Sequence, residues 1–178
     1  HHITGIHTFS DPIRAIEEAD AIVVGGGNTW HLVRMLHKKK LMNPLREKAF
    51  EGTPYIGWSA GSNIACPTLR TTNDMPIIDP RGFDCTGLIP FQINPHYLDA
   101  NAQGHAGETR EQRISEFTEL NPEVYVAGLR EGTMLKLEDG KLQLIGDRTC
   151  RIFKKGKEPV ELSSSDDFNF LMESGFLA

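Results

Sequence analysis

Two short apolar runs in this sequence each end in a glycine-containing turn and lead directly into a segment with helical spacing. The first run covers residues 21–24 and is followed by three glycines, and the second covers residues 54–59, PYIGWS. The first run is continuously apolar, which predicts a strand that is buried on both faces, and the second predicts a short apolar strand. Because strands and helices alternate, we expect an α/β fold with a parallel or mixed sheet and helices on both faces.

Capping residues and apolar spacing predict where the helices begin. Asp11 followed by Pro12 is typical of a helix start, with Asp as the N-cap and Pro at the first helical position. Either Asn28 or Thr29 is suited to cap the next helix, in which apolar residues recur at helical spacing. Three further helices are expected over residues 43–51, from Gly61 onward, and over residues 110–120.

The second part of the chain reads as a long irregular segment followed by strands and hairpins. Residues 67–110 are rich in Pro, Asn, Asp and Gly, and they predict loops with one short strand near residues 91–93. An irregular segment of this length inside a domain is usually functional. A buried strand is expected over residues 125–129. Two C-terminal hairpins are predicted, over residues 133–146 around the Asp139-Gly140 turn and over residues 151–162 with a turn near Gly156.

Length and composition limit the classes of protein that this chain can represent. A chain of 178 residues favours a single domain, and its net charge of −5 argues against a nucleic-acid-binding surface. No apolar run approaches the roughly 20 residues that a membrane helix needs. The three cysteines are scattered and form no CxxC pair, which predicts reduced thiols and no structural zinc site. The sequence indicates no metal and no cofactor.

The pattern Gly57-x-Ser59-x-Gly61 lies at a predicted strand-to-helix junction. In this context the pattern is typical of a nucleophile elbow, in which a strained turn lifts the serine hydroxyl clear of the sheet. The flanking glycines leave room for the backbone and for an incoming carbonyl group. The alternative interpretation is a packing turn in which Ser59 is only a small residue. Trp58 is expected to form a pocket wall.

The three glycines at 25–27 follow the neighbouring strand, at the sheet edge where ligands bind in such folds. Glycine-rich backbone at this edge can aim free N–H groups at a developing oxyanion, together with the N–H group of Ala60. The competing interpretation is a phosphate-binding loop. Neither GxGxxG nor GxxxxGK[ST] is present here, which weakens that alternative.

A serine nucleophile requires a base, and histidine is the usual one. His96 and His105 are the two candidates in the irregular segment, and His96 is favoured because it follows Pro95 and an apolar run. Glu131 directly follows a predicted buried strand and is a candidate for the acid that orients the imidazole. Asp74 is an alternative for that role, or for binding a cationic group of the substrate.

Several segments together resemble the peptidase E family of α-aspartyl dipeptidases, serine peptidase family S51. The matching segments are VVGGGNT, YIGWSAGSN, ACPTLRTTNDMPI, INPHY, GHAGETREQRI and LREGT. The resemblance covers about residues 3–160. It implies a glutamine-amidotransferase-like fold and a cytoplasmic serine dipeptidase that cleaves Asp-Xaa dipeptides without a cofactor. Its partner would be a small peptide substrate, with no nucleic acid or membrane, and the protein would be a monomer or a homodimer.

The resemblance also assigns roles to residues of this sequence. It implies that Ser59 is the nucleophile, His96 the base and Glu131 the orienting acid. It implies oxyanion donors at the backbone N–H groups of Gly27 and Ala60. For the substrate-binding pocket it implies Arg110 against the aspartyl carboxylate, Asp74 facing the α-ammonium or supporting the triad, and Asn28 and Thr72 as further pocket residues.

Two departures from the family pattern lead to further expectations. The family carries a strand–helix–strand segment before the position of His2, so we expect residues 1–178 to form a single α/β peptidase domain that lacks this segment. Arg130 stands where the family often has proline, which predicts an added positive charge beside Glu131 and a lower basicity of that carboxylate. Two rival functions are a cyanophycinase-like peptidase acting on aspartyl polymers and a non-catalytic small-molecule binder on the same fold.

Overall fold

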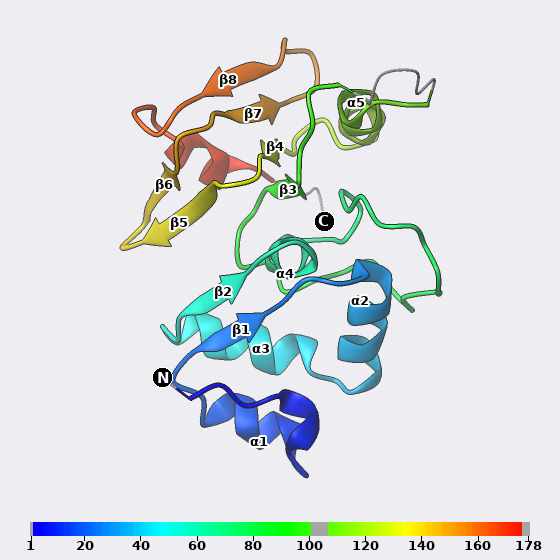
Figure 1. The fold of residues 1–178 in the computed structure, drawn as a ribbon, viewed down its shortest axis with the longest axis vertical. Coiled ribbons are helices and arrows are strands. Elements are labelled where there is room, and N and C mark those ends of the chain that lie inside the picture. The colour runs from blue at the N-terminus through cyan, green and yellow to red at the C-terminus, as the bar shows by residue number, and fades with distance from the viewer. Residues whose placement is uncertain (1, 101–106, 176–178) are drawn as a thin grey trace.

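The computed structural model describes residues 2–100 and 107–175 as an α/β protein (Figure 1). The helices are α1 (Pro12–Glu17), α2 (Thr29–Lys38), α3 (Met42–Phe50), α4 (Ala60–Ala65) and α5 (Arg110–Leu120), with 3-10 turns η1 (Ile6–Thr8) and η2 (Asn169–Glu173). The strands are β1 (Ile22–Val24), β2 (Tyr55–Gly57), β3 (Gln92–Pro95), β4 (Val126–Leu129), β5 (Met134–Glu138), β6 (Lys141–Ile145), β7 (Cys150–Phe153) and β8 (Val160–Leu162).

The strands form parallel and mixed sheets, which confirms the expected fold class. β1 and β2 pair in parallel, and β3 and β4 pair in parallel within the four-stranded order β3-β4-β7-β8. β7 and β8 complete that sheet in antiparallel orientation, and β5 and β6 form a separate hairpin. The described residues therefore form three separate sheets instead of one continuous sheet. Helix α4 lies between the β1–β2 sheet and the four-stranded sheet and contacts both β2 and β3 (Figure 1).

The helix starts follow the capping signals of the sequence. The side chain of Asp11 accepts a hydrogen bond from the N–H of Arg14 (3.1 Å), as expected for the N-cap of α1. Asn28, rather than Thr29, caps α2 by accepting from the N–H of His31 (3.0 Å). Thr109 and Gln112 form a capping box that begins α5 at Arg110, as predicted.

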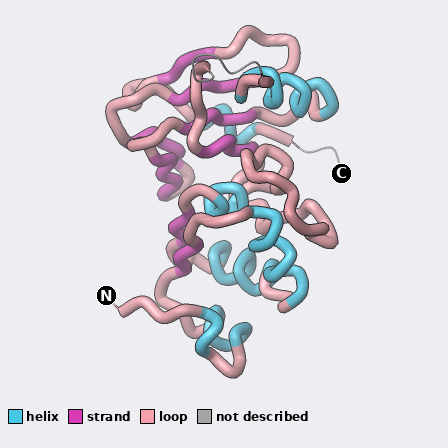
Figure 2. The backbone as a smooth tube through the Cα atoms, turned by 45° about the vertical axis from the view of Figure 1, so that its right-hand side comes forward, coloured by secondary structure: helices cyan, strands magenta, loops and turns pink. Residues whose placement is uncertain are grey.

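The β1–β2 pair is buried on one face and exposed on the other. Ile22 packs with side chains of α1, α2 and α3 in a common core. On the opposite face, Val23 is 42% exposed, Ile56 55% and Trp58 54%. The expectation that the strand over residues 21–24 is buried on both faces is therefore wrong, because Val23 is exposed. Figure 2 shows the helices of this part of the molecule on one side of the β1–β2 pair.

A second core lies under the four-stranded sheet. Phe91, Ile93, Ala127 and Ile152 pack there with η2 and with the inner side of the β5–β6 hairpin. Both predicted hairpins are confirmed. Asp139 and Gly140 have φ angles of 49° and 74°, and Gly156 has a φ of 73°, which is the left-handed region that such turns require. Within residues 2–100 and 107–175, no helix is long and apolar enough to cross a membrane.

Candidate active site

Ser59 lies on a sharp turn between β2 and α4, as the GxSxG pattern predicts. Its backbone angles are φ 55° and ψ −115°, a conformation that costs energy for a residue with a side chain. The flanking glycines make this turn possible. A Cβ atom on Gly61 would lie 2.0 Å from the carbonyl oxygen of Val24, and one on Gly57 would lie 2.5 Å from that of Gly61. Both glycines are therefore required by the close approach of backbone segments.

The glycine loop after β1 packs directly against Ser59. A Cβ atom on Gly26 would lie 3.2 Å from the Cβ and 3.5 Å from the Oγ of Ser59. Gly27 has a φ of 132°, which few residues other than glycine adopt. In the part of the chain that the structure describes, no hydrogen bond uses the N–H group of Gly27 or of Ala60. These two groups, next to the serine, are candidate donors to an oxyanion.

His96 and Glu131 lie side by side at the carboxyl edge of the four-stranded sheet. β3 and β4 are parallel, with Pro95 opposite Leu129, so the residues that follow these strands emerge at the same edge. The Nδ1 atom of His96 forms a hydrogen bond with Oε1 of Glu131. This bond leaves Nε2 of the imidazole available for proton transfer. His96 itself has a φ of 54°, so a second non-glycine residue of the site has an uncommon backbone conformation.

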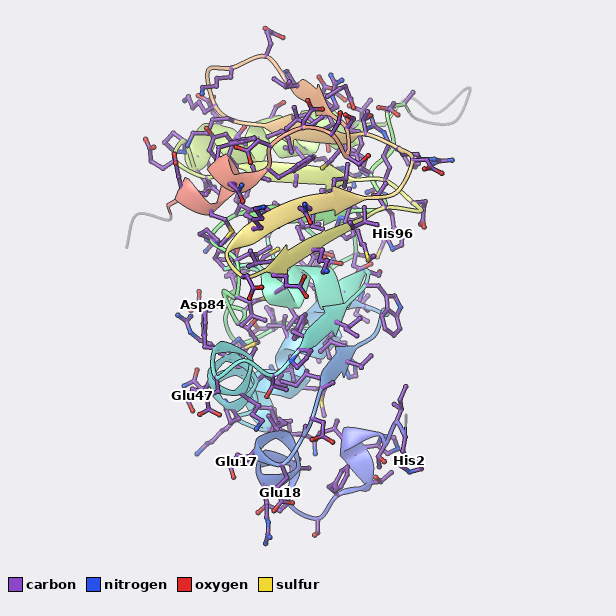
Figure 3. The ribbon with its side chains drawn as sticks, turned by 90° about the vertical axis from the view of Figure 1, so that its left-hand side faces the viewer. His2, Glu17, Glu18, Glu47, Asp84 and His96 are labelled. Atoms are coloured by element: carbon purple, nitrogen blue, oxygen red, sulfur yellow. The ribbon has the colours of Figure 1, made fainter. Side chains whose placement is uncertain are left out.

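Ser59, His96 and Glu131 line the same cavity. Its volume is about 470 Å³, and Trp58 and Arg130 also contribute to its wall, which makes Trp58 the pocket wall that the sequence predicts. Figure 3 shows His96 at the level where the β5–β6 hairpin meets the β1–β2 part of the molecule. No hydrogen bond among the described residues joins Ser59 to His96. Catalytic hydrogen bonds are often loose before substrate binds.

Asp74 contacts the start of α2 rather than the histidine. Its Oδ2 atom accepts hydrogen bonds from the N–H (2.7 Å) and the hydroxyl (2.6 Å) of Thr29. The other two predicted pocket residues belong to the same cluster. Thr72 Oγ1 donates to Thr29 Oγ1 (3.0 Å), and Asn28 Nδ2 donates to the carbonyl oxygen of Met75 (3.0 Å). Of the two candidate acids, Glu131 therefore contacts His96, and Asp74 anchors the segment that follows the glycine loop.

Arg110 is the first residue of α5, and it lies within electrostatic range of Asp74. Burial and the neighbouring Arg113 lower the pKa of Arg110, while the charge of Asp74 opposes this shift. An arginine remains charged despite such a shift. Within residues 2–100 and 107–175, no ion pair or hydrogen bond engages its side chain. His105, the alternative base, lies outside the described residues.

The cysteines are free, as the sequence predicts, and the structure shows that all three are buried. Burial raises the pKa of Cys66 and of Cys150 to about 12 and also raises that of Cys85. A thiol with so high a pKa is a poor nucleophile. Among the described residues, no group of three or more His, Cys, Asp or Glu side chains is arranged to hold a metal ion.

Sequence reasoning placed Thr72 and Asp74 of the polar segment 71–75 in the pocket, but it missed the contacts of Thr71 and Asn73 with the end of β3. Thr71 Oγ1 donates to the carbonyl oxygen of Ile93 (2.8 Å), and Asn94 Nδ2 donates to Asn73 Oδ1 (2.7 Å). This segment thereby joins the end of β3, which carries His96, to the start of α2. The signal in the sequence was a run of hydroxyl and amide side chains in a segment with no periodicity.

The fold and this arrangement of side chains define a class of protein. A serine on a strained strand-to-helix turn, with a paired histidine and carboxylate lining the same cavity, is typical of hydrolytic enzymes built on α/β folds. The model of Peptidase family S51 matches residues 1–145, and the chain belongs to this family. The resemblance found in the sequence is thereby confirmed.

Named relatives and solved structures agree with this assignment. The chain is 55% identical to a peptidase E of Nostoc sp. over 168 residues, which cover 94% of this chain and 69% of the relative. It is 50% identical to a peptidase E of Salmonella typhimurium over 167 residues, covering 94% and 73%.

Two crystal structures share the fold at low sequence identity. One is a putative peptidase E from Listeria monocytogenes, with a TM-score of 0.52 and 22% identity, covering 85% of this chain and 64% of that one. The other is a peptidase from an acI-B1 actinobacterium, with a TM-score of 0.58 and 16% identity, covering 88% and 62%. This chain thus spans less than two thirds of the length of either protein.

Proposed function

We propose that the protein is a serine-type dipeptidase that hydrolyses dipeptides with an N-terminal, α-linked aspartate. The observation that carries this proposal is the strained Ser59 turn, which lines one cavity with the hydrogen-bonded His96–Glu131 pair. Membership in Peptidase family S51 and the similarity to proteins named peptidase E support it.

The reaction proceeds through an acyl-enzyme. Ser59 Oγ attacks the scissile carbonyl carbon while Nε2 of His96 takes the hydroxyl proton. The N–H groups of Gly27 and Ala60 bind the oxyanion that forms. His96 then donates its proton to the leaving amine, and the carbon–nitrogen bond breaks. Water attacks the ester with His96 as base, and the proton returns to Ser59 as aspartate leaves.

Glu131 orients the base in this mechanism. Its carboxylate holds the Nδ1–H of His96, which leaves Nε2 as the unprotonated nitrogen that can accept the serine proton. When His96 takes the serine proton, the same carboxylate stabilises the imidazolium that forms.

Arg110 and Asp74 account for the preference for an N-terminal aspartate. The planar guanidinium of Arg110 can donate two hydrogen bonds to the two oxygens of the substrate β-carboxylate. An asparagine side chain has only one acceptor oxygen and cannot form this paired contact. Asp74 lies near enough to affect the pKa of Arg110, and its negative charge suits the α-ammonium group of the same residue. Asn28 and Thr72 complete this pocket.

The first test compares Asp-Leu, Asn-Leu, Glu-Leu and acetyl-Asp-Leu as substrates for wild type and Ser59→Ala. We expect cleavage of Asp-Leu alone, and loss of activity by a factor of about 10⁶ in the variant. A fluorophosphonate should label Ser59 irreversibly in the wild type only. Retained activity in Ser59→Ala would remove the serine mechanism. Cleavage of the acetylated peptide would favour the cyanophycinase-like alternative.

The role of Arg110 is tested by Arg110→Gln, with Arg113→Gln as the matched control on the same helix. Arg113 pairs with Glu108 at 3.5 Å on the exposed side of α5. We expect Arg110→Gln to lose most activity towards Asp-Leu and its preference over Asn-Leu, while the control keeps both. An unchanged preference in Arg110→Gln would remove Arg110 from its role.

We further propose that the protein acts in the cytoplasm as a monomer or a homodimer, with small peptides as its partners. The family resemblance and the three free cysteines support this location. Cell fractionation and light scattering of the purified protein test the two statements. Recovery from an extracytoplasmic fraction, or a larger assembly, would contradict them.

A further inference from the structure

The side chain of Arg130 lies beside the His96–Glu131 pair and is only 10% exposed. It follows β4 and directly precedes Glu131. A guanidinium this deeply covered requires partners for its donors, because an unpaired buried charge is costly. The partners of Arg130 belong to two different parts of the structure, the loop after His96 and the β7–β8 side of the sheet.

The first partner belongs to the loop that follows His96. Asp99 accepts from Nε of Arg130 (3.2 Å) and, through its other oxygen, from Nη2. A two-point bond of this kind fixes the orientation of both groups as well as their distance. Arg130 therefore holds the loop carrying the base against the end of the strand that carries the orienting acid.

The second group of partners belongs to the far side of the sheet. Glu161 on β8 accepts from Nη1 (2.8 Å) and Nη2 (2.9 Å), and the backbone carbonyl of Thr149, just before β7, accepts from Nη1 (2.8 Å). Hydrogen bonds from Arg130 are the main reason why the pKa of Glu161 is lowered to about 2. Glu161 thus remains ionised, and the guanidinium is anchored to rigid strands.

Tyr97 fills the space between Arg130 and the sheet. The guanidinium carbon lies 5.3 Å from the centre of the Tyr97 ring, and this residue is buried. The N–H of Tyr97 donates to the carbonyl oxygen of Leu129 (3.0 Å). A Cβ atom on Gly128 would lie 2.8 Å from the ring, so only glycine fits beneath it. His96 is therefore held between Pro95, the last residue of β3, and the buried Tyr97.

The same ion pairs extend to the helix that carries Arg110. Arg151 on β7 donates to Glu161 (3.1 Å) and pairs with Glu111 in the first turn of α5 (3.0 Å). Glu111 is the neighbour of Arg110. A continuous chain of charged groups thus connects the segment of the base, the segment of the acid and the start of the substrate-binding helix.

We propose that Arg130 is a positioning residue that clamps the His96 loop to the Glu131 strand end and so sets the geometry of the pair. This inference rests on the proposed function. Two carboxylates share the single charge of Arg130, and its side chain bonds to them rather than to Glu131. The added charge predicted from the sequence is therefore directed away from the acid, and its effect on catalysis is geometric.

The test compares Arg130→Met, Arg130→Lys and Asp99→Asn in the natural full-length protein. We expect Arg130→Met to lower kcat by about 100-fold with KM nearly unchanged, because small misplacements of reacting groups cost this much. Arg130→Lys should recover only part of the loss, since an ammonium group lacks the planar fork. Asp99→Asn removes only the charged contact to the His96 loop and should lower kcat about tenfold.

Lys154→Met is the matched control for these variants. Lys154 directly follows β7 at the end of the sheet remote from the pair. It pairs with Glu123 at 3.6 Å, and its Nζ atom lies 4.5 Å from the centre of the Tyr125 ring. It should keep the kcat of the wild type. Circular dichroism confirms that each variant is folded at the assay temperature. If Arg130→Met does not fold, Asp99→Asn decides the test, because it leaves the contacts to Glu161 and Thr149 intact. A wild-type kcat in folded Arg130→Met, or in Asp99→Asn, would overturn the proposal.

Two measurements without a peptide separate this proposal from the proposed function. The first is the rate at which a fluorophosphonate labels Ser59. If the wild type is labelled but cleaves no aspartyl dipeptide, the substrate class is wrong, and slower labelling in Arg130→Met still supports the clamp. The second is the far-downfield proton NMR signal of an Nδ1–H bonded to a carboxylate. We expect this signal in the wild type and in Lys154→Met. Its persistence in Arg130→Met would contradict the clamp even if the protein is no peptidase.

Discussion

The serine half of the site and its histidine half are held in place by different kinds of interaction. In the serine half, formed by β1, β2 and α4, backbone atoms approach one another at Gly57 and Gly61 so closely that no side chain fits. In the histidine half, formed by β3, β4, β7 and β8, charged side chains such as Arg130 and Glu161 join neighbouring segments. Ser59 is thus positioned by backbone packing and His96 by electrostatic contacts.

This difference has physical consequences. Packing of glycine against backbone does not depend on the ionisation of any group, so the Ser59 turn should tolerate changes of pH and salt. Ion pairs weaken as salt screens them and as carboxylates take up protons. The histidine half is therefore expected to lose its geometry first when conditions change, and substitutions in the two halves should affect the protein in different ways.

The largest effect is expected from Glu131→Gln, which replaces the carboxylate that bonds to Nδ1 of His96 in the histidine half. The amide cannot stabilise an imidazolium and can favour the wrong tautomer of His96, so kcat should fall by roughly 10³- to 10⁴-fold, or about 4–5.5 kcal/mol. Steady-state kinetics on Asp-Leu measure this. The exposed pair of Glu138 with Lys136 (2.7 Å) provides the control, because Glu138→Gln should leave kcat unchanged. A similar loss in both variants would mean that the contact with His96 is not decisive.

Gly61→Ala tests the serine half and should have the next largest effect, here on the free energy of unfolding. The new Cβ would lie 2.0 Å from the carbonyl oxygen of Val24, so backbone must move, at a cost of about 3 kcal/mol of unfolding free energy. Urea denaturation measures the loss. Gly175→Ala is the control, because a Cβ there meets no atom within 4 Å. If Gly61→Ala is as stable as the control, the turn is looser than the structure indicates.

Asp74→Ala probes the segment that links the two halves. It removes both hydrogen bonds to Thr29 and should cost about 2 kcal/mol of unfolding free energy. Asp79→Ala, which loses one exposed bond to the N–H of Arg81 (2.8 Å), should cost much less. Equal losses in thermal unfolding of the two variants would contradict the anchoring role of Asp74.

A second substitution at the same position separates anchoring from substrate binding. In Asp74→Asn the amide oxygen can still accept from Thr29, so stability should be nearly unchanged, but the negative charge is lost. If Asp74 binds the substrate ammonium, KM for Asp-Leu rises in this variant. An unchanged KM would leave Asp74 as an anchor only.

The smallest effect is expected from Glu161→Gln, and it should depend on pH. The folded-state pKa of Glu161 is lowered from 4.5 to about 2, so its ionised form stabilises the fold above pH 4.5, and this contribution is lost as pH falls towards 2. At pH 7 the variant should be less stable by about 1 kcal/mol, because the pair is partly exposed to solvent. The difference between wild type and variant, measured by denaturation, should vanish near pH 2. A constant difference would show that the charge is not responsible.

Much of the fold and part of the site could be predicted because their signals are local. The cap at Asp11, the Asp139-Gly140 turn and the limits of α5 depend on residues within one helical turn or one hairpin. The Ser59 turn is local in the same sense, since its strand, glycines and helix lie within residues 55–65. The exposure of Val23 and Ile56 was not predictable, because burial depends on what packs against a strand.

The sequence by itself determined the α/β class, the order of the elements and the position of the candidate nucleophile, because short-range steric and capping preferences act along the chain. From the residues alone it left His96 and His105, and Glu131 and Asp74, as alternatives. Only the tertiary structure joined His96 to Glu131, placed Asp74 at the start of α2 and surrounded Arg130 with carboxylates. These contacts join side chains far apart in the chain. The pairing of β3 with β4, the pairing of β7 with β4 and β8, and the path of the polar segment bring them together.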